Sequence, residues 1–358
     1  MTRFGIEEEF LLLDEDSLVP VALSGDVLER IGDDVTAGRV TTEYLASQVE
    51  ALTDPVRTGA EAVQQLSALR TAIGTQARAR RAIAAPTGSP FTTLHSPRLS
   101  PSAHYDDVAR RLAHLTREHE VNGLHVHIEV PDEEERIRAL NRLRAWLPLL
   151  LALSTNSPFG NGLDTGFASW RSMLIRRLPS SWCPPRFADV DDYRARVDQL
   201  LALGTIGEAT SLSWAVRLSE RYPTVEARVA DTQLTAEDAV LSALLTRGIA
   251  LSSGQRIVAD ETETIDASIW MASRSGMTAR IVDPLTGEVC PAWSVAEHLV
   301  DDIGPVLDDL DDAAAVREGL DRMRADGTGA ARQRAAHARD GLPGLRRLLQ
   351  EGTGTPAD

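Results

Sequence analysis

The chain has 358 residues, and its 53 acidic residues outnumber its 37 basic ones, giving a formal net charge of −16 at pH 7. This acid excess argues against a nucleic-acid-binding surface, which needs a basic stripe, and is compatible with binding divalent cations. All 37 basic residues are arginines. Mechanisms that need a lysine, such as a Walker phosphate loop or Schiff-base chemistry, are therefore excluded, and any bound phosphate must be held by arginine, backbone N–H groups or metal.

The sequence favours a soluble cytoplasmic protein of one domain. Two cysteines, Cys183 and Cys290, do not make a disulfide framework, which fits a reducing compartment. The N-terminal segment MTRFGIEEEF is too acidic for a signal peptide, and the apolar run at 147–153 is too short to span a membrane. Because no Pro/Gly/Ser-rich linker is long enough to separate two domains, we expect one domain over residues 1–350 and a frayed tail over 351–358.

Apolar spacing and turn residues divide the chain into strands and helices. In the first half they predict a strand over 1–13, a helix from Asp54 to about Arg81, a loop over 85–90, a short helix over 106–120 and a strand over 121–130. In the second half they predict a helix from Pro131, a Gly- and Asn-rich loop over 156–166, helices over 191–203 and 235–253, a strand over 223–231 between them, and helical stretches in the last sixty residues.

Three of the predicted strands alternate apolar side chains with chemically active ones. Neighbouring side chains in a strand point to opposite faces of the sheet. The polar faces then carry Glu7 and Glu9 in the first strand, His125, His127 and Glu129 in the second, and Thr224, Glu226 and Arg228 in the third. Alternation alone is typical of any half-solvated antiparallel strand, but this concentration of Glu and His is unusual for a solvated face. Glu8 falls on the apolar side, where the pattern does not explain it.

These faces are candidates for a metal site. Carboxylates two residues apart on one strand face lie roughly 6–7 Å apart and repel each other unless a cation lies between them. A carboxylate-rich site with a single imidazole prefers Mg²⁺ or Mn²⁺, whereas zinc would prefer more nitrogen or sulfur ligands. Glu43 and Glu50 form a further acidic pair, which shares one side only if its segment is helical, and two surface acids are the plainer interpretation.

Eight segments, in order along the chain, resemble the glutamate–cysteine ligase family 2, also described as carboxylate–amine ligases. They are 5–10, Glu43 with 48–50 and Thr53, 86–90, 123–127, 157–159, 164–171, 223–228 and 272–276. The sequence departs from the family pattern at Gly160, where we expect tryptophan, and within 179–184, 213–217 and 272–276. Because these departures lie where substrate would bind, they concern the identity of the substrate more than the ATP and metal chemistry.

The resemblance implies an α+β fold like that of glutamine synthetase, in which a curved, mostly antiparallel sheet forms a funnel and helices pack behind it. It also implies an ATP- and Mg²⁺-dependent ligase with two or three ions, Mn²⁺ being an alternative metal. Such an enzyme activates a carboxylate as an acyl phosphate and transfers the acyl group to an amine. In the best-known members the γ-carboxyl of glutamate is joined to cysteine. Small amino acid and amine substrates are therefore expected, without nucleic acid or membrane partners, and a homodimer is common among relatives.

The resemblance also suggests roles for individual residues. The expected metal ligands are Glu7, Glu9, Glu43, Glu50, His125 and Glu226. Arg228 and Arg171 are expected to act in catalysis, and Arg217, Arg228, Arg274 and Thr165 to bind nucleotide. Arginine suits this task because guanidinium binds phosphate in a bidentate way, and no lysine is present to replace it.

Three alternatives share these residues. A divalent-metal hydrolase would use His125, His127, Glu7 and Glu9 without ATP; a phosphagen-kinase-like enzyme would stop after phosphate transfer; and a binding protein would keep only the fold. ADP release that depends on both an acid and an amine separates the ligase from all three. The base for the amine is not identified by the sequence, with His127 and Glu129 as candidates, and the 156–166 loop is a candidate lid.

Overall fold

The computed structural model describes residues 2–31, 35, 37–94, 96–253 and 256–354, and this part of the chain is built around one seven-stranded sheet. The strand order is β2 (Arg39–Thr42), β3 (Gln48–Leu52), β1 (Phe4–Asp14), β5 (Gly123–Glu129), β9 (Thr224–Asp231) and β8 (Val216–Leu218), with β4 (Ala82–Ala85) paired to β1. All of these pairings are antiparallel. The α+β class and the mostly antiparallel sheet are therefore confirmed.

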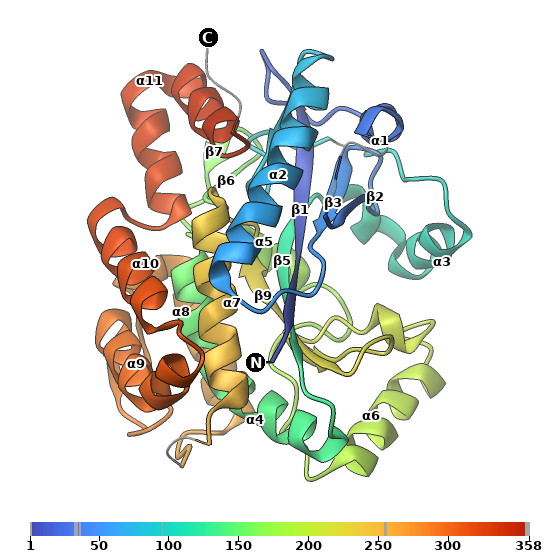
Figure 1. The fold of residues 1–358 in the computed structure, drawn as a ribbon. Helices are drawn as coiled ribbons and strands as arrows, with labels where there is room; N and C mark the ends of the chain where they lie inside the picture. The colour runs from blue at the N-terminus through green and yellow to red at the C-terminus, as the bar shows by residue number, and fades with distance from the viewer. Residues whose placement is uncertain (1, 32–34, 36, 95, 254–255, 355–358) are drawn as a thin grey trace.

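Helices cover one face of this sheet. The inner layer consists of α2 (Gly59–Arg78), α4 (Glu133–Ser154) and α7 (Ala236–Leu251), and Figure 1 shows α2 and α7 running alongside β1 and β5. Outside it, α8 (Thr262–Ser275), α9 (Ala292–Asp309) and α10 (Ala313–Asp326) pack on α4 and α7, and α11 (Gly329–Glu351) reaches β4. Within the described ranges, no helix is both long enough and apolar enough to cross a bilayer.

Smaller elements connect and flank these layers. They are α1 (Ser24–Ile31), α3 (Ala103–Leu112), the 3-10 helix η2 (Ala113–Glu118), the β6–β7 hairpin (Phe159–Gly160 and Leu163–Asp164), α5 (Trp170–Ile175), α6 (Val190–Ala202), the 3-10 helices η3 (Ala209–Ser211) and η4 (Gly276–Thr278), and the β10–β11 hairpin (Arg280–Val282 and Val289–Pro291).

Local chemistry explains where some elements differ from their predicted limits. The helix expected from Asp54 begins only after Thr58, which forms a capping box with Glu61 and so satisfies free N–H groups of the first turn. The helix expected over 106–120 is divided into α3 and η2 at Ala113, whose φ of 50° lies in the left-handed region.

The two faces of the sheet differ as the alternation predicts. Ile6, Leu124, Val126 and Ile128 are at most 2% exposed and belong to the core that also contains the apolar faces of α4 and α7. Burying such side chains contributes about 25 cal/mol per Å² of apolar surface, which fixes which face turns toward the helices. The opposite face is thereby left free for the acidic and imidazole side chains.

Glu8 is the exception to this alternation, and its partner is Arg70 on α2. Glu8 is fully buried on the helix-covered side, where Arg70 Nε lies 2.9 Å from its Oε2 and Nη2 lies 2.5 Å from its Oε1. Arg70 also donates to the main-chain carbonyls of Gln233, Leu234 and Gly352. Burial raises the pKa of Glu8, and Arg70 counteracts that effect. This buried pair therefore joins β1, α2, the segment after β9 and the C-terminal end of α11.

The expected C-terminal tail is partly ordered against the protein. Gly352 accepts the hydrogen bond from Arg70, and Thr353 is 1% exposed. Of the range 351–358, residues 355–358 lie outside the described residues.

Candidate metal and substrate site

Strand register brings the acidic and imidazole side chains opposite one another. Glu7 on β1 is paired with His125 on β5, and His127 on β5 is paired with Glu226 on β9. Directly paired residues of adjacent strands project to the same face. Three segments that are far apart in the sequence therefore present their polar side chains on one surface.

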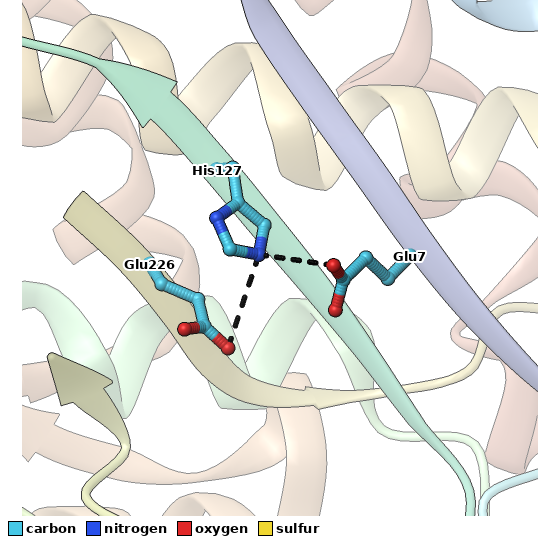
Figure 2. Close-up of side chains that lie close together, drawn as sticks. All are labelled: Glu7, His127 and Glu226. Carbon is cyan, nitrogen blue, oxygen red and sulfur yellow. Dashed lines mark ion pairs between the residues drawn. The ribbon is translucent and has the colours of Figure 1, made fainter. Parts of the chain in front are cut away.

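The side-chain atoms of this surface are close to one another. His127 Nε2 lies 3.3 Å from Glu7 Oε1 and 3.9 Å from Glu226 Oε1. Figure 2 shows these three side chains converging from their three strands. His125 Nδ1 lies 3.3 Å from Glu7 Oε2, and its Nε2 lies 3.8 Å from Glu9 Oε1. Glu7 is the most exposed of the five, with 23% of its side chain accessible, so the cluster is largely shielded from water.

Glu43 and Glu50 join this cluster through a β-hairpin. Glu50 lies on β3 opposite Glu9, and Glu43 directly follows β2, so the helical arrangement considered for this pair is not present. The described residues form three sets whose potential ligand atoms lie within 4.8 Å of one another: Glu7, His127 and Glu226; Glu7, Glu50 and His125; Glu9, Glu43 and Glu50. Overlapping oxygen-rich sets of this kind fit more than one hard divalent cation.

Electrostatic repulsion among the carboxylates of the cluster also favours the binding of divalent cations. Burial and the charge of Glu9 raise the pKa of Glu43 to about 8, and burial with the charge of Glu43 raises the pKa of Glu50 well above its ordinary range. Carboxylates held together in a shielded site resist full ionisation. A bound divalent cation would supply the missing positive charge, so the donor set fits Mg²⁺ in both its chemistry and its charge.

Two arginines neutralise the negative charge of Glu226, at the end of the cluster away from Glu43 and Glu50. Arg217 Nε lies 2.7 Å from Glu226 Oε2, and Arg228 Nη1 donates to Glu226 Oε1. Burial raises the pKa of Glu226, but Arg228 and Arg217 outweigh that effect and hold the pKa below its usual range. Arg228 Nη1 also lies 3.3 Å from His125 Nδ1, so this guanidinium borders both the acidic and the imidazole groups.

Arg171 is buried beside the cluster. On α5, its guanidinium donates to the carbonyls of Val229 and Arg228, both at 3.3 Å, and lies 3.8 Å from Asp231. Its Nε has no hydrogen-bond partner among the described residues, although it is buried. An unpartnered buried donor is costly in an otherwise satisfied interior, so Arg171 is suited to an anionic ligand.

Thr165 and Arg274 lie outside the cluster. Thr165 Oγ1 donates to the Pro158 carbonyl, and Arg274 donates to the Gly166 carbonyl and lies over the Phe167 ring. Neither is among the described residues that line the three cavities bordering the cluster. Their polar atoms support the loop itself, so the structure does not bring these two expected nucleotide ligands to the site.

The candidate lid over 156–166 is anchored at its start. Asn156 is fully buried and donates to the carbonyls of Pro86 and Thr232, and Ser157 donates to Asp231. The rest forms the β6–β7 hairpin, whose Leu163 is 70% exposed. The hairpin is anchored as well, because the Gly162 N–H donates to the Phe91 carbonyl at 2.8 Å and Arg334 pairs with Asp164 at 2.7 Å. Contacts at both its start and its hairpin therefore hold the candidate lid in this conformation.

Within the described part of the chain, three cavities border the cluster. We name them after one residue each: the Arg171 cavity (≈ 170 Å³), the Tyr222 cavity (≈ 310 Å³) and the Tyr105 cavity (≈ 540 Å³). The Arg171 and Tyr105 cavities adjoin, because both are lined by Glu43, Tyr44, His119, Leu178, Ser213 and Arg228. The Tyr222 cavity is lined by Glu7 and His127 and so lies at the other side of the cluster.

Sequence reasoning missed several members of this site. His127 stood on the correct face but was not counted among the metal ligands, although its alternation with His125 carried the signal. Tyr44 and His119 line two cavities and had no recognisable pattern, because neither lies in a strand with alternating faces.

Comparison with known sequences gives one family over nearly the whole chain. The model of "Glutamate-cysteine ligase family 2(GCS2)" matches residues 3–351. A protein of Saccharopolyspora erythraea, provisionally named glutamate–cysteine ligase 2-2, is 38% identical over 347 residues, covering 94% of this chain and 88% of its own length. A protein of Mycobacterium sp. (strain KMS) with the same provisional name is 37% identical over 344 residues, covering 94% of each chain.

Solved structures share the fold at much lower sequence identity. A glutamate–cysteine ligase from Francisella tularensis in complex with AMP superimposes with a TM-score of 0.73 at 13% identity, over 99% of this chain and 88% of its own. A bifunctional glutathione synthetase from Pasteurella multocida gives a TM-score of 0.72 at 16% identity, over 99% of this chain and 52% of its own. At these identities the likeness establishes the fold.

Proposed function

The chain belongs to the glutamate–cysteine ligase family 2 and is a ligase of the carboxylate–amine type, and we propose that it uses ATP to convert an acid into an acyl phosphate that an amine then attacks. The γ-carboxyl of glutamate is the first candidate for the acid and cysteine the first candidate for the amine. The observation that carries the proposal is the shielded cluster of carboxylates and imidazoles between three cavities.

In this proposal Glu7, Glu9, Glu43, Glu50, His125 and Glu226 hold two or three Mg²⁺ ions, with Mn²⁺ as a substitute, and His127 supports them. Bound Mg²⁺ would neutralise charge on the β- and γ-phosphates of ATP as the phosphoryl group transfers. Arg228 lines the Arg171 and Tyr105 cavities, where its guanidinium can bind phosphate oxygens. The N–H groups of Arg217 are taken by Glu226 and by the carbonyls of Thr210 and Leu212, so Arg217 holds Glu226 in place beside Arg228. The carboxylate cluster thus replaces the lysine-containing phosphate loop that this chain lacks.

The cavities suit substrates of different size and charge. The Arg171 cavity is lined by the buried guanidinium-bearing side chain of Arg171, whose positive charge suits the carboxylate of a small acid. The Tyr222 cavity is larger and borders the cluster through Glu7 and His127, which suits the nucleoside part of ATP. The Tyr105 cavity adjoins the Arg171 cavity and gives the amine a separate approach. Together they would form the funnel that is expected of the polar sheet face.

The test is ADP release by the purified chain with ATP and Mg²⁺, over glutamate and other amino acids paired with cysteine and simple amines. We expect ADP to form rapidly only when a suitable acid and amine are both present. A hydrolase would form product without ATP, and a phosphagen-kinase-like enzyme would release ADP with a single substrate. Either result would contradict the ligase assignment.

We also expect Mg²⁺ to stabilise the protein more strongly as the pH rises. The folded chain binds protons at Glu43 and Glu50 more tightly than the unfolded chain does, since both pKa values are raised. Without metal, stability should therefore fall as the pH rises from about 5 to about 8, and bound Mg²⁺ should remove that loss.

Thermal unfolding with EDTA or with Mg²⁺, at about pH 5.5 and about pH 8, measures this effect. A Glu50→Gln variant serves as the matched comparison. Because it lacks one titrating carboxylate, its stability without metal should depend less on pH. If Mg²⁺ raises the unfolding temperature by the same amount at both pH values, these carboxylates do not hold the ion.

A further inference from the structure

His119 occupies the wall shared by the Arg171 and Tyr105 cavities. It directly follows η2, and the edge of its ring meets Tyr44 at a centroid distance of 6.4 Å. Among the described residues, neither of its ring nitrogens has a hydrogen-bond or ion-pair partner. An imidazole without partners, facing two adjoining cavities, is available to a ligand in either of them.

Its surroundings keep this imidazole uncharged. Burial, with Arg177 and Arg171 nearby, lowers the pKa of His119 to about 4. At neutral pH the ring therefore has one nitrogen that accepts a proton. The negative charge of an acyl phosphate bound beside Arg228 would raise the basicity of the ring at the moment when it is needed.

The other groups of this shared wall are less suited to accept a proton. Burial raises the pKa of the Tyr44 hydroxyl to about 12, and Ser213 Oγ is hydrogen-bonded to Ser180 Oγ at 2.9 Å. Glu43 and Arg228 belong to the acidic cluster and its arginine edge. His119 is therefore the neutral acceptor at the junction of the two cavities.

The two bases considered from the sequence lie elsewhere. His127 Nδ1 is hydrogen-bonded to Thr224 at 3.0 Å, and its other nitrogen faces Glu7. Glu129 is held by Arg3 at 2.6 Å. Both residues line the Tyr222 cavity, across the acidic cluster from the junction where His119 lies.

We propose, building on the ligase function proposed above, that His119 is the general base that takes the proton from the amine as the amine attacks the acyl phosphate. The amine nitrogen forms a bond to the acyl carbon, and the bond between that carbon and the phosphate oxygen breaks, its electron pair leaving with phosphate. The proton released from nitrogen passes to His119 and then to the departing phosphate or to water. The products are an amide and inorganic phosphate, and no other reactant is needed.

The experiment compares two nucleophiles on His119→Gln. With cysteine or another ordinary amine, ligation should fall by at least about 100-fold, the size of a general-base contribution. Hydroxylamine attacks acyl phosphates without the help of a base. Hydroxamate formation from the same acid and ATP should therefore stay within about threefold of the unchanged protein, which also shows that the variant folds and still activates the acid.

The matched control is His114→Gln. His114 lies in η2 on the same segment, with 75% of its side chain exposed, and lines none of the three cavities. This variant should retain both reactions. If His119→Gln lowers both reactions equally, or neither, His119 is not the base. If the unchanged protein forms no hydroxamate with any acid, the ligase function itself fails, and the role of His119 fails with it.

Discussion

Glu9→Gln is expected to lower ligation by at least about 100-fold, equivalent to about 2.7 kcal/mol of transition-state stabilisation, while the fold persists. Glu9 Oε2 accepts the Gly123 N–H at 2.6 Å, and the amide oxygen of glutamine can accept the same bond. The substitution therefore removes one negative charge from the set formed with Glu43 and Glu50, and little else. Activity under saturating ATP and Mg²⁺ measures the effect.

The control for this variant is Glu135→Gln, which removes a carboxylate of the same kind from the surface of α4. Glu135 pairs with Arg138, and 53% of each side chain is exposed. The Glu135→Gln variant should keep its full activity. The unfolding temperatures of both variants should lie within about 2 °C of that of the starting protein. If Glu9→Gln keeps more than about a tenth of the activity, Glu9 does not hold a metal that the reaction needs.

Arg70→Met is expected to cost about 3–5 kcal/mol of unfolding free energy, because it leaves Glu8 buried without its partner. The side chains of Arg70 and Glu8 are 2% and 0% exposed, so water cannot replace the lost contacts. The three backbone carbonyls that Arg70 binds would also lose their donor. Urea unfolding of both proteins gives the difference directly.

A double-mutant cycle separates the ion pair from the carbonyl contacts. In Glu8→Gln with Arg70→Met, the buried charge is gone, so the combined loss should be smaller than the sum of the two single losses. Arg138→Met, at an exposed pair, should cost less than about 1 kcal/mol. Additive losses in the cycle, or a small loss for Arg70→Met alone, would mean that the buried pair is not coupled as its geometry indicates.

The strands follow their sequence pattern more closely than any other part of the molecule. The alternation around Glu7, His127 and Glu226 correctly predicted one shared face, because side-chain direction in a strand follows from local backbone geometry. The same rule could not explain Glu8, since its partner Arg70 is 62 residues away and only the packing of α2 on β1 brings them together. Strand pairing also decided the position of Glu43 and Glu50, which the residue spacing alone left open between one face of a helix and two surface acids.

Segments without periodicity were the least predictable. Thr165 and Arg274 matched a family pattern, yet their polar atoms are used by the loop around Gly166. His119 carried no pattern, although it lies at the junction of two cavities. In both cases the surroundings of the side chain come from elements that are remote in the sequence.

By itself, the sequence determined the chemical character of this protein: arginine as the cationic side chain in place of lysine, an excess of carboxylates, and strands whose acidic and apolar side chains point to opposite faces. These properties depend on residue type and on the two-residue period of a strand. Only the tertiary structure decided which carboxylates lie close enough to share a cation, which arginines border them and where the cavities lie. Those features depend on strand register and on helix packing, which are set by contacts between residues far apart along the chain.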